Sequence, residues 1–217
     1  MVSQTIHIDQ NQLSSLEQRY RAHLVNSLSG FKSANLIGSV SELGQTNLAI
    51  VSSVIHLGAD PALVGFISRP HSVARDTLSN IIATSCYTIN QVNSDIWQQA
   101  HQTSARYETD QCEFDAVGLT PAYHEGVLAP FVAQSRLKYA VKLESVETIA
   151  LNQTLLVIGS ITDILLDDTA LKSDGSVDIE RLNCVCVSGL DSYHRTERLG
   201  RLSYAKPDKP LTLIDEY

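Results

Sequence analysis

The sequence lacks the short motifs that mark several common enzyme classes. It contains no GxSxG nucleophile elbow, no HExxH zinc motif, no P-loop, no GxGxxG dinucleotide fingerprint and no CxxC pair. Each of these motifs fixes a nucleophile, a metal ligand or a phosphate-binding loop on a defined turn. Their absence argues against α/β-hydrolases, zincin peptidases, P-loop nucleotide hydrolases and Rossmann dehydrogenases.

Long apolar runs and positive charge are also scarce. No window approaches the roughly 20 apolar residues of a membrane span, and the opening MVSQTIHIDQNQ lacks the basic start and apolar core of a signal peptide. Lys and Arg total 16 against 24 Asp and Glu, which gives a formal net charge of -8. This acidic balance argues against extensive nucleic-acid binding. We therefore expect a soluble, cytoplasmic protein that binds neither nucleic acid nor membrane.

Cysteines are few, and none has a metal-ligand partner nearby in the sequence. The four thiols, at positions 86, 112, 184 and 186, lie inside apolar stretches of a chain without an export signal, which favours free buried thiols over disulfides. Cys184 and Cys186 share one face of a predicted strand, but no His or carboxylate stands beside them at ligand spacing. The seven histidines are scattered as well. We expect no metal site.

The strand-like segments dominate what the sequence does contain. They are ANLIGSV, NLAIVSSVI, ALVGFI, CYTINQV, SRLKYAVKLESV, LLVIGSITDILL and NCVCVSG. Most are joined by turn-like pieces such as SELGQT and LGADP rather than by crossover helices. The pattern therefore favours an antiparallel barrel or sandwich over a doubly wound sheet.

Helical spacing is confined to a few segments. An amphipathic helix is predicted over residues 9–30, with Ser15 and Gln18 as a capping box, and short helices are predicted over 76–84 and 94–102. The chain of 217 residues is 43% hydrophobic, which is enough for one core without metal or disulfide support. We predict one domain over residues 1–217, with a helical extension at 1–30 and a C-terminal tail at 190–217.

Charged and hydroxyl side chains cluster in SRPHSVARDTLSNI, residues 68–81, between a predicted strand and a predicted helix. Asp76 or Thr77 can cap this helix, whose first-turn amides and dipole attract an anion. Arg69 and Arg75 add guanidinium groups that suit phosphate oxygens. A simpler interpretation, a capped helix beside a surface ion pair of Arg75 with Asp76, accounts equally well for this stretch alone.

Polar residues also interrupt the apolar strand that precedes this cluster. In NLAIVSSVI, Asn47, Ala49 and Ser53 fall at alternate positions and so share one face of a strand, whereas Leu48 and Ser52 face the other side. An amide, a small side chain and a hydroxyl on one face suit a flat ring with polar edges. This second segment favours a ligand-binding role for the charged cluster.

Taken in order, five segments resemble the flavin reductase-like proteins, which have an FMN-binding split β-barrel. The segments are NLAIVSSVIHLGADPALVGFI, RPHSVARDTLSNI, YTIN, AHQTSARYETDQCEFDAVGL and GLDSYHRTERLGRLSYAKP, and the resemblance covers residues 26–207. It implies a mainly β fold, an antiparallel Greek-key split β-barrel with an N-terminal helix and short peripheral helices. It also implies a homodimer of six-stranded barrels with FMN near the subunit interface.

The resemblance assigns cofactor contacts to particular residues. It places Asn47, Leu48 and Ala49 at the flavin ring, Ser52 and Ser53 at the ring edge or ribityl chain, and Ser68, Arg69, Arg75, Asp76 and Thr77 at the phosphate, with His71 as a further candidate. Tyr193, His194 and Arg195 form either a lid near the cofactor or an ordinary polar loop. Glu113 stands where similar reductases often have Lys or Ser.

The function that this resemblance implies is NAD(P)H-dependent flavin reduction. FMN would carry the hydride received from a stacked nicotinamide, so no catalytic side chain is predicted. The reduced flavin would pass its electrons to free flavin, to a partner or to an oxidant. Two alternatives stay open: an FMN-binding electron-transfer or oxygenase component with a separate redox partner, and a barrel that binds another phosphorylated ligand without redox chemistry.

Overall fold

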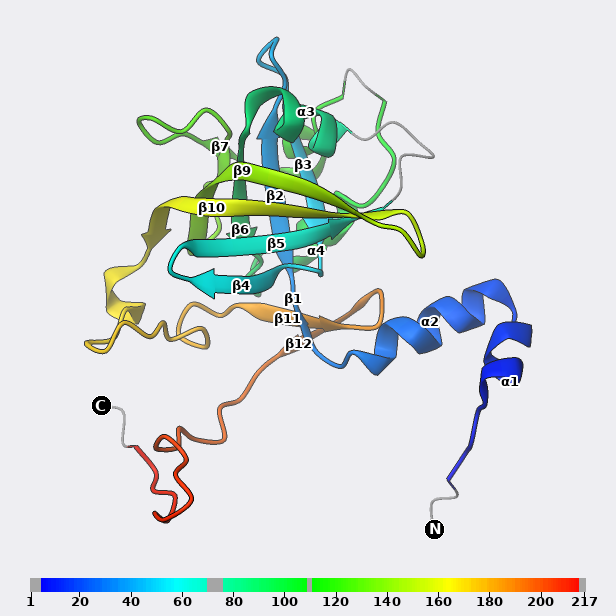
Figure 1. The fold of residues 1–217 in the computed structure, drawn as a ribbon. Helices are drawn as coiled ribbons and strands as arrows, with labels where there is room; N and C mark the ends of the chain where they lie inside the picture. Colours follow the sequence, from blue (N-terminus) through cyan, green and yellow to red (C-terminus); the bar gives the residue numbers. More distant parts are fainter. Residues whose placement is uncertain (1–4, 70–75, 109–110, 215–217) are drawn as a thin grey trace.

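A seven-stranded antiparallel sheet forms the centre of the computed structural model, which describes residues 5–69, 76–108 and 111–214. The strand order is β3-β2-β6-β9-β10-β5-β4, and Figure 1 shows the long strands β9 and β10 crossing the front of the molecule. The strands are β2 (Asn35–Val40), β3 (Thr46–Val51), β4 (Ile55–Ala59), β5 (Ala62–Ser68), β6 (Cys86–Gln91), β9 (Leu137–Ile149) and β10 (Thr154–Leu166). The predicted mainly β, antiparallel fold is confirmed, but the sheet has seven strands rather than the expected six.

Strands β3 and β4 follow each other in the chain but lie at opposite edges of this sheet. Only residues 52–54 join them. A flat sheet of this order would separate its edges by roughly 29 Å, because neighbouring strands lie about 4.8 Å apart. The extended link reaches only about 14 Å from Val51 to Ile55. The sheet must therefore curl until its edges meet, and the sequence-based prediction of one continuous strand over 47–55 is wrong.

The core fills the inside of this curled sheet. Ile37, Phe66, Tyr87 and Val157 belong to one apolar cluster and are almost fully buried. Packing is close enough that Gly38 has no room for a side chain, since an added Cβ would stand 2.5 Å from Thr88 Oγ1 and would also overlap the Pro130 carbonyl oxygen. A second cluster, which includes Leu48 and Phe114, packs beneath the helices that border β3.

Short helices and two small sheets surround the barrel. The helices are α3 (Asp76–Thr84), α4 (Trp97–Gln102), α5 (Glu113–Val117) and the 3-10 turn η1 (Asp168–Ala170); the small sheets are β1 (Lys32–Ser33) with β11 (Val185–Ser188) and β12 (Ser192–Arg195), and β7 (Pro121–Ala122) with β8 (Phe131–Val132). The predicted helix over 76–84 is confirmed, the one predicted from 94 begins at Trp97, and α5 was not predicted.

The N-terminal segment forms two helices rather than the single predicted helix over 9–30. They are α1 (Gln10–Ser15) and α2 (Gln18–Leu28), and Figure 1 shows them projecting away from the barrel. The capping box is formed by Asp9 with Gln12, not by Ser15 with Gln18. Glu17 caps α2 by accepting hydrogen bonds from two backbone amides. Neither helix has a buried residue, so each ends at its own cap rather than at a packing boundary.

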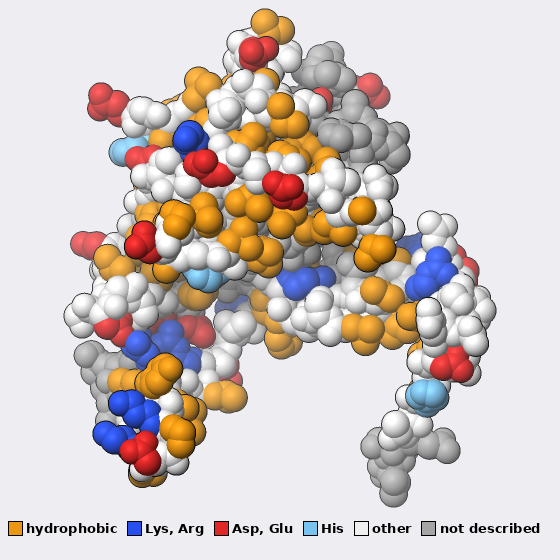
Figure 2. Space-filling model, in the orientation of Figure 1, with side chains coloured by type: hydrophobic (Ala, Val, Ile, Leu, Met, Phe, Trp, Pro, Cys, Tyr) orange, Lys and Arg blue, Asp and Glu red, His pale blue; other side chains and the backbone are white. Residues whose placement is uncertain are grey.

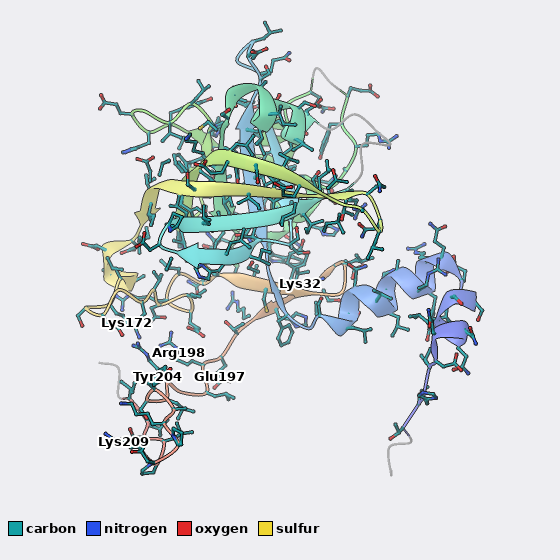
Figure 3. All side chains as sticks on the ribbon, viewed as in Figure 1. Lys32, Lys172, Glu197, Arg198, Tyr204 and Lys209 are labelled. Carbon is teal, nitrogen blue, oxygen red and sulfur yellow. The ribbon has the colours of Figure 1, made fainter. Side chains whose placement is uncertain are left out.

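The C-terminal segment is tied to the loop after η1 by ion pairs. Arg198 lies 2.8 Å from Glu180 and 3.5 Å from Asp178, and Lys172 lies 3.7 Å from Asp178 (Figure 3). Beyond Arg198 the chain descends away from the barrel (Figure 1). Among the described residues, no helix is both long and apolar enough to span a bilayer.

Candidate functional site

A cavity of about 650 Å³ opens where several elements of the barrel end. Its walls come from β3 and the 52–54 link, the end of β5, the first turn of α3, the end of α4 and the β11–β12 hairpin. A volume of this size falls within the range of roughly 300–1,000 Å³ that is typical of cofactor and small-molecule sites. The cavity is therefore the leading candidate for a binding site.

Most of the predicted cofactor residues line this cavity. They are Asn47, Ala49, Ser52, Ser53, Ser68, Arg69, Asp76 and Thr77. Leu48 does not, because its side chain is fully buried in the core cluster beneath α4 and α5. His71 and Arg75 lie outside the described residues. The fold thus gathers three separate segments at one place, while their contacts with a ligand stay a prediction.

Ser52 and Ser53 differ in what their hydroxyl groups do. Ser53 Oγ donates to the carbonyl oxygen of Ile67 at 3.2 Å and accepts from the Ile67 amide at 3.0 Å. Because Ile55 pairs with Gly65, Ser53 stands opposite Ile67, and its side chain replaces the strand partner that β4 no longer supplies. Ser52 Oγ has no hydrogen-bond partner in the described part of the chain. Residues 52–54 join the two edges of the curled sheet, and we call this junction the barrel seam. Ser53 therefore ties the barrel seam to β5, whereas Ser52 is available to a ligand.

Asn47 ties the beginning of β3 to the first turn of α3. Its Nδ2 donates to Thr77 Oγ1 at 2.8 Å and to Ser39 Oγ at 3.3 Å. Asn47 is 8% exposed, so these bonds lie largely out of water and hold their geometry. Asn80, one turn further along α3, also donates to Ser39 Oγ at 3.3 Å. The hydroxyl of Thr77 is thereby fixed at the cavity wall.

The outward edge of β3 is closed by side chains from the neighbouring helices. Glu113 Oε2 accepts from the Leu48 amide at 3.1 Å, and Thr103 Oγ1 accepts from the Ile50 amide at 3.0 Å. Thr103 also donates to the carbonyl oxygen of Ala100 at 2.8 Å. These bonds satisfy the amides that an edge strand otherwise leaves unpaired. The amides of Leu48 and Ile50 are therefore not available to a ligand.

Charges of both signs line the cavity. Glu113 and Asp76 contribute carboxylates, while Arg69 and Arg106 contribute guanidinium groups. Burial raises the pKa of the Glu113 carboxyl, the hydrogen bond from Leu48 opposes this rise, and the charge of Asp76 adds to it. The carboxylates thus lie near the α3 and α5 side, and an anionic ligand group must reach an arginine or a backbone amide.

The comparison with protein families identifies this architecture. The model of the flavin reductase like domain matches residues 28–180, which is well over half of the chain. The chain belongs to this family. The match includes β3, β5, α3 and α4, which all contribute to the cavity wall. The resemblance predicted from the sequence segments is thereby confirmed.

Three solved structures illustrate the relationship. A split barrel protein from Shewanella frigidimarina NCIMB 400, assigned provisionally as a flavin reductase, is 53% identical, has a TM-score of 0.90 and covers 93% of this chain and 100% of its own. Nitrilotriacetate monooxygenase component B from Bacillus cereus is 18% identical (TM-score 0.79; 92% and 100% covered). An FMN-binding protein from Thermus thermophilus is 16% identical (TM-score 0.65; 76% and 86% covered). The last two share the fold with this member of the flavin reductase-like family.

The wall formed by the end of α4, the chain beyond it and the β11–β12 hairpin contains residues that sequence reasoning missed. His101, Thr103 and Tyr107 come from the end of α4 and the chain beyond it, and they line the cavity together with Leu190 and Tyr193. Their segments lie far apart in the sequence, so no local pattern could have joined them. Of the three residues that could form a lid near the cofactor, Tyr193, His194 and Arg195, only Tyr193 lines the cavity. His194 instead contacts Ser188 Oγ at 2.7 Å through Nε2.

Proposed function

We propose that this protein is an FMN-binding flavoprotein that acts as an NAD(P)H-dependent flavin reductase. The observation that carries the proposal is the convergence of β3, the end of β5 and the first turn of α3 on one cavity. These are the segments that the family resemblance assigns to the flavin ring and to the phosphate. Membership of the flavin reductase-like family supports the same conclusion.

The residues of the cavity fit the two ends of FMN. Ala49 and Val51 offer small or apolar surface for a flat ring, and the free hydroxyl of Ser52 offers a donor beside it. Ser68, Arg69 and Thr77 supply donors for a phosphate at the other end. Bound FMN would supply hydride and electron chemistry, while the protein holds the ring and limits access to it.

Asp76 has a different role from its neighbours at the phosphate end. It stands in the first turn of α3, where a carboxylate interacts favourably with the helix dipole. Its negative charge would repel a phosphate, so we assign Asp76 to the helix start and Thr77 and Arg69 to direct contact. The nine residues of α3 give this helix end a full set of first-turn amides.

Two measurements on the purified protein test the proposal. Titration with FMN, followed by flavin fluorescence, is expected to show saturable binding. Steady-state assays with NADH and NADPH, each against free FMN and FAD, are expected to show oxidation of at least one nicotinamide. Protein that takes up no FMN would refute the flavin site and would favour a barrel for another phosphorylated ligand. Protein that binds FMN but consumes neither nicotinamide would refute only the reductase activity.

A second candidate function is that of a flavin-binding component that passes electrons to a separate oxygenase or redox partner. The similarity to nitrilotriacetate monooxygenase component B, whose name denotes one part of a multicomponent enzyme, favours it. This alternative needs the same cavity. It predicts that chemically reduced FMN-loaded protein is reoxidised faster when a partner is added, with no turnover of NADH or NADPH by the protein alone.

We also propose that the protein forms a homodimer, as the resemblance implies. Strands β4, β5 and β10 carry apolar side chains on their outer face, and Figure 2 shows this hydrophobic surface across the front of the barrel. Ile55 is 45% and Leu57 39% exposed. The side chains of Leu57 and Leu156 lie over Gly65, because an added Cβ there would stand 3.0 and 3.2 Å from them.

Burial of this face by a second copy would remove from water the apolar surface that spans β4, β5 and β10. Light scattering coupled to size exclusion is expected to give the mass of a dimer. Leu57→Lys places a charge at the centre of the face and is expected to shift the mass toward the monomer, whereas Leu43→Lys, on an exposed turn away from it, is not. A wild-type monomer would refute the proposal.

A further inference from the structure

Tyr193 of β12 and His101 of α4 form a hydrogen-bonded pair on the wall of the cavity that also contains the predicted flavin residues. His101 Nδ1 lies 3.0 Å from the Tyr193 hydroxyl oxygen, and both residues line the cavity. Their rings meet edge to face, with centroids 5.6 Å apart. The ring of Trp97, one turn before His101, lies 5.4 Å from that of Tyr193. The pair is therefore held by packing as well as by its hydrogen bond.

Contacts on both sides fix the pair in place. The end of α4, which carries His101, is bound to β3 through Thr103. The turn before Tyr193 is bound by Lys32, whose Nζ donates to the carbonyl oxygens of Gly189 at 2.9 Å and Asn26 at 3.2 Å; Lys32 is labelled in Figure 3. Both residues are thus mounted on restrained elements, as a recognition site requires.

The pair keeps one donor beyond its internal bond. Burial, with a smaller contribution from Asp191, raises the pKa of Tyr193 to about 12, so the hydroxyl is protonated in the neutral range. If it donates to Nδ1, the neutral imidazole carries its proton on Nε2. If Nδ1 carries the proton, the Tyr193 hydroxyl is the remaining donor. Either arrangement offers one N–H or O–H group to an acceptor.

The surroundings favour an uncharged acceptor on a planar ligand. Leu190 and Val187 make the adjoining wall apolar, and the ring of Tyr193 adds an aromatic surface. The negative charge of Asp191 acts on Tyr193, which disfavours an anion at this position. The arginines of the cavity come from other elements, at positions 69 and 106.

We propose that His101 and Tyr193 bind the carboxamide of the nicotinamide donor and so position its ring against the flavin. This inference rests on the proposed reductase function and deepens it, because it assigns the second substrate to the wall formed by α4 and the β11–β12 hairpin. The two residues are positioning residues, and neither is asked to transfer hydride or to hold the cofactor.

The test separates nicotinamide recognition from flavin binding. Tyr193→Phe keeps the ring but removes the hydroxyl, and His101→Ala removes the imidazole. Loss of one hydrogen bond is expected to raise the KM for the NADH or NADPH that the wild type uses about 3- to 10-fold. The kcat is expected to fall as well, by less than about 10-fold, because a misplaced nicotinamide ring transfers hydride more slowly. The Kd for FMN is expected to stay within about 2-fold of the wild type. The double variant is expected to cost no more than the larger single effect, because the residues act as one unit.

Matched controls are Tyr204→Phe and His124→Ala, both of which lie outside the cavity and are expected to change none of these constants. An unchanged KM in both cavity variants would overturn the inference and leave the reductase function intact. A parallel loss of FMN affinity would also overturn it, since the pair would then belong to the cofactor contacts. A wild-type protein that consumes neither NADH nor NADPH would overturn both proposals. If Tyr193→Phe fails to fold, His101→Ala decides the question alone.

Discussion

Adjacent serines at the barrel seam allow a direct separation of stability from ligand binding. Ser53 bonds both backbone groups of Ile67, whereas Ser52 lines the same cavity with no partner among the described residues. Replacement of Ser53 by Ala leaves one N–H and one C=O of a half-buried residue without their partners. The same replacement at Ser52 breaks no described hydrogen bond.

The expected magnitudes differ accordingly. An unsatisfied buried polar group costs about 1–3 kcal/mol, and partial access of water to Ile67 keeps the total for Ser53→Ala within about that range. For a protein of this size, each kcal/mol lowers the melting temperature by roughly 2–4 °C. Ser52→Ala is expected to change the free energy of unfolding by less than about 0.5 kcal/mol. It should instead raise the Kd for FMN about 2- to 10-fold, the value of one hydrogen bond.

Urea denaturation followed by circular dichroism gives the unfolding free energies, and flavin fluorescence gives the Kd. Both variants should be compared without FMN, because bound ligand adds its own stabilisation. Equal stability of Ser53→Ala and the wild type would refute the seam role of Ser53. A stability loss in Ser52→Ala as large as that in Ser53→Ala would refute the distinction between the two hydroxyl groups.

Other substitutions test the hydrogen bond that ties Asn47 to α3, the carboxyl of Glu113 and the close packing around Gly38. Thr77→Val removes the acceptor for Asn47 and is expected to cost about 1–3 kcal/mol in urea denaturation and to weaken FMN binding, while Thr77→Ser should restore both. Burial raises the pKa of the Glu113 carboxyl, so as pH rises the folded state keeps this proton longer than the unfolded state does. The free energy of unfolding therefore decreases as pH rises above 4.5 through the folded-state pKa. Glu113→Gln should remove this fall, and the measurement is the wild-type-minus-variant difference in unfolding free energy against pH. Gly38→Ala forces a methyl group against the carbonyl of Pro130 and is expected to lower stability by about 1–3 kcal/mol, seen as a lower melting temperature.

Strand identity was predictable from the sequence because it depends on local periodicity. The alternation in β9 and the apolar runs in β5 and β6 mark strands whatever their neighbours are. Closure of the sheet was not predictable in this way. The break after Val51 falls at two serines inside a strand-like stretch, and only the pairing of Ile55 with Gly65 on the far edge requires it. The two N-terminal helices were merged for a similar reason, since one helical period runs through Leu16 and Tyr20.

The part of the cavity wall that we assign to the phosphate was easier to find from the sequence than the wall formed by α4 and the β11–β12 hairpin. Ser68 to Thr77 form one continuous segment with a recognisable helix start, so composition and capping chemistry point to it. His101 and Tyr193 lie 92 positions apart and meet only in the folded chain. Leu48 shows the converse difficulty, because a family pattern places it at the flavin whereas packing directs its side chain into the core.

Several parts of the cavity wall are fastened to β3 or to the link that follows it. Asn47 binds α3, the amides of Leu48 and Ile50 bind α5 and the end of α4, and Ser53 binds β5. An edge strand has one side without backbone hydrogen bonds to a neighbouring strand. In β3 the groups on that side bind the helices around the site. Because Thr103 connects β3 to the helix that carries His101, a displacement of β3 would move the predicted flavin residues and the nicotinamide wall together. Strand β3 thus links the two proposed ligand sites.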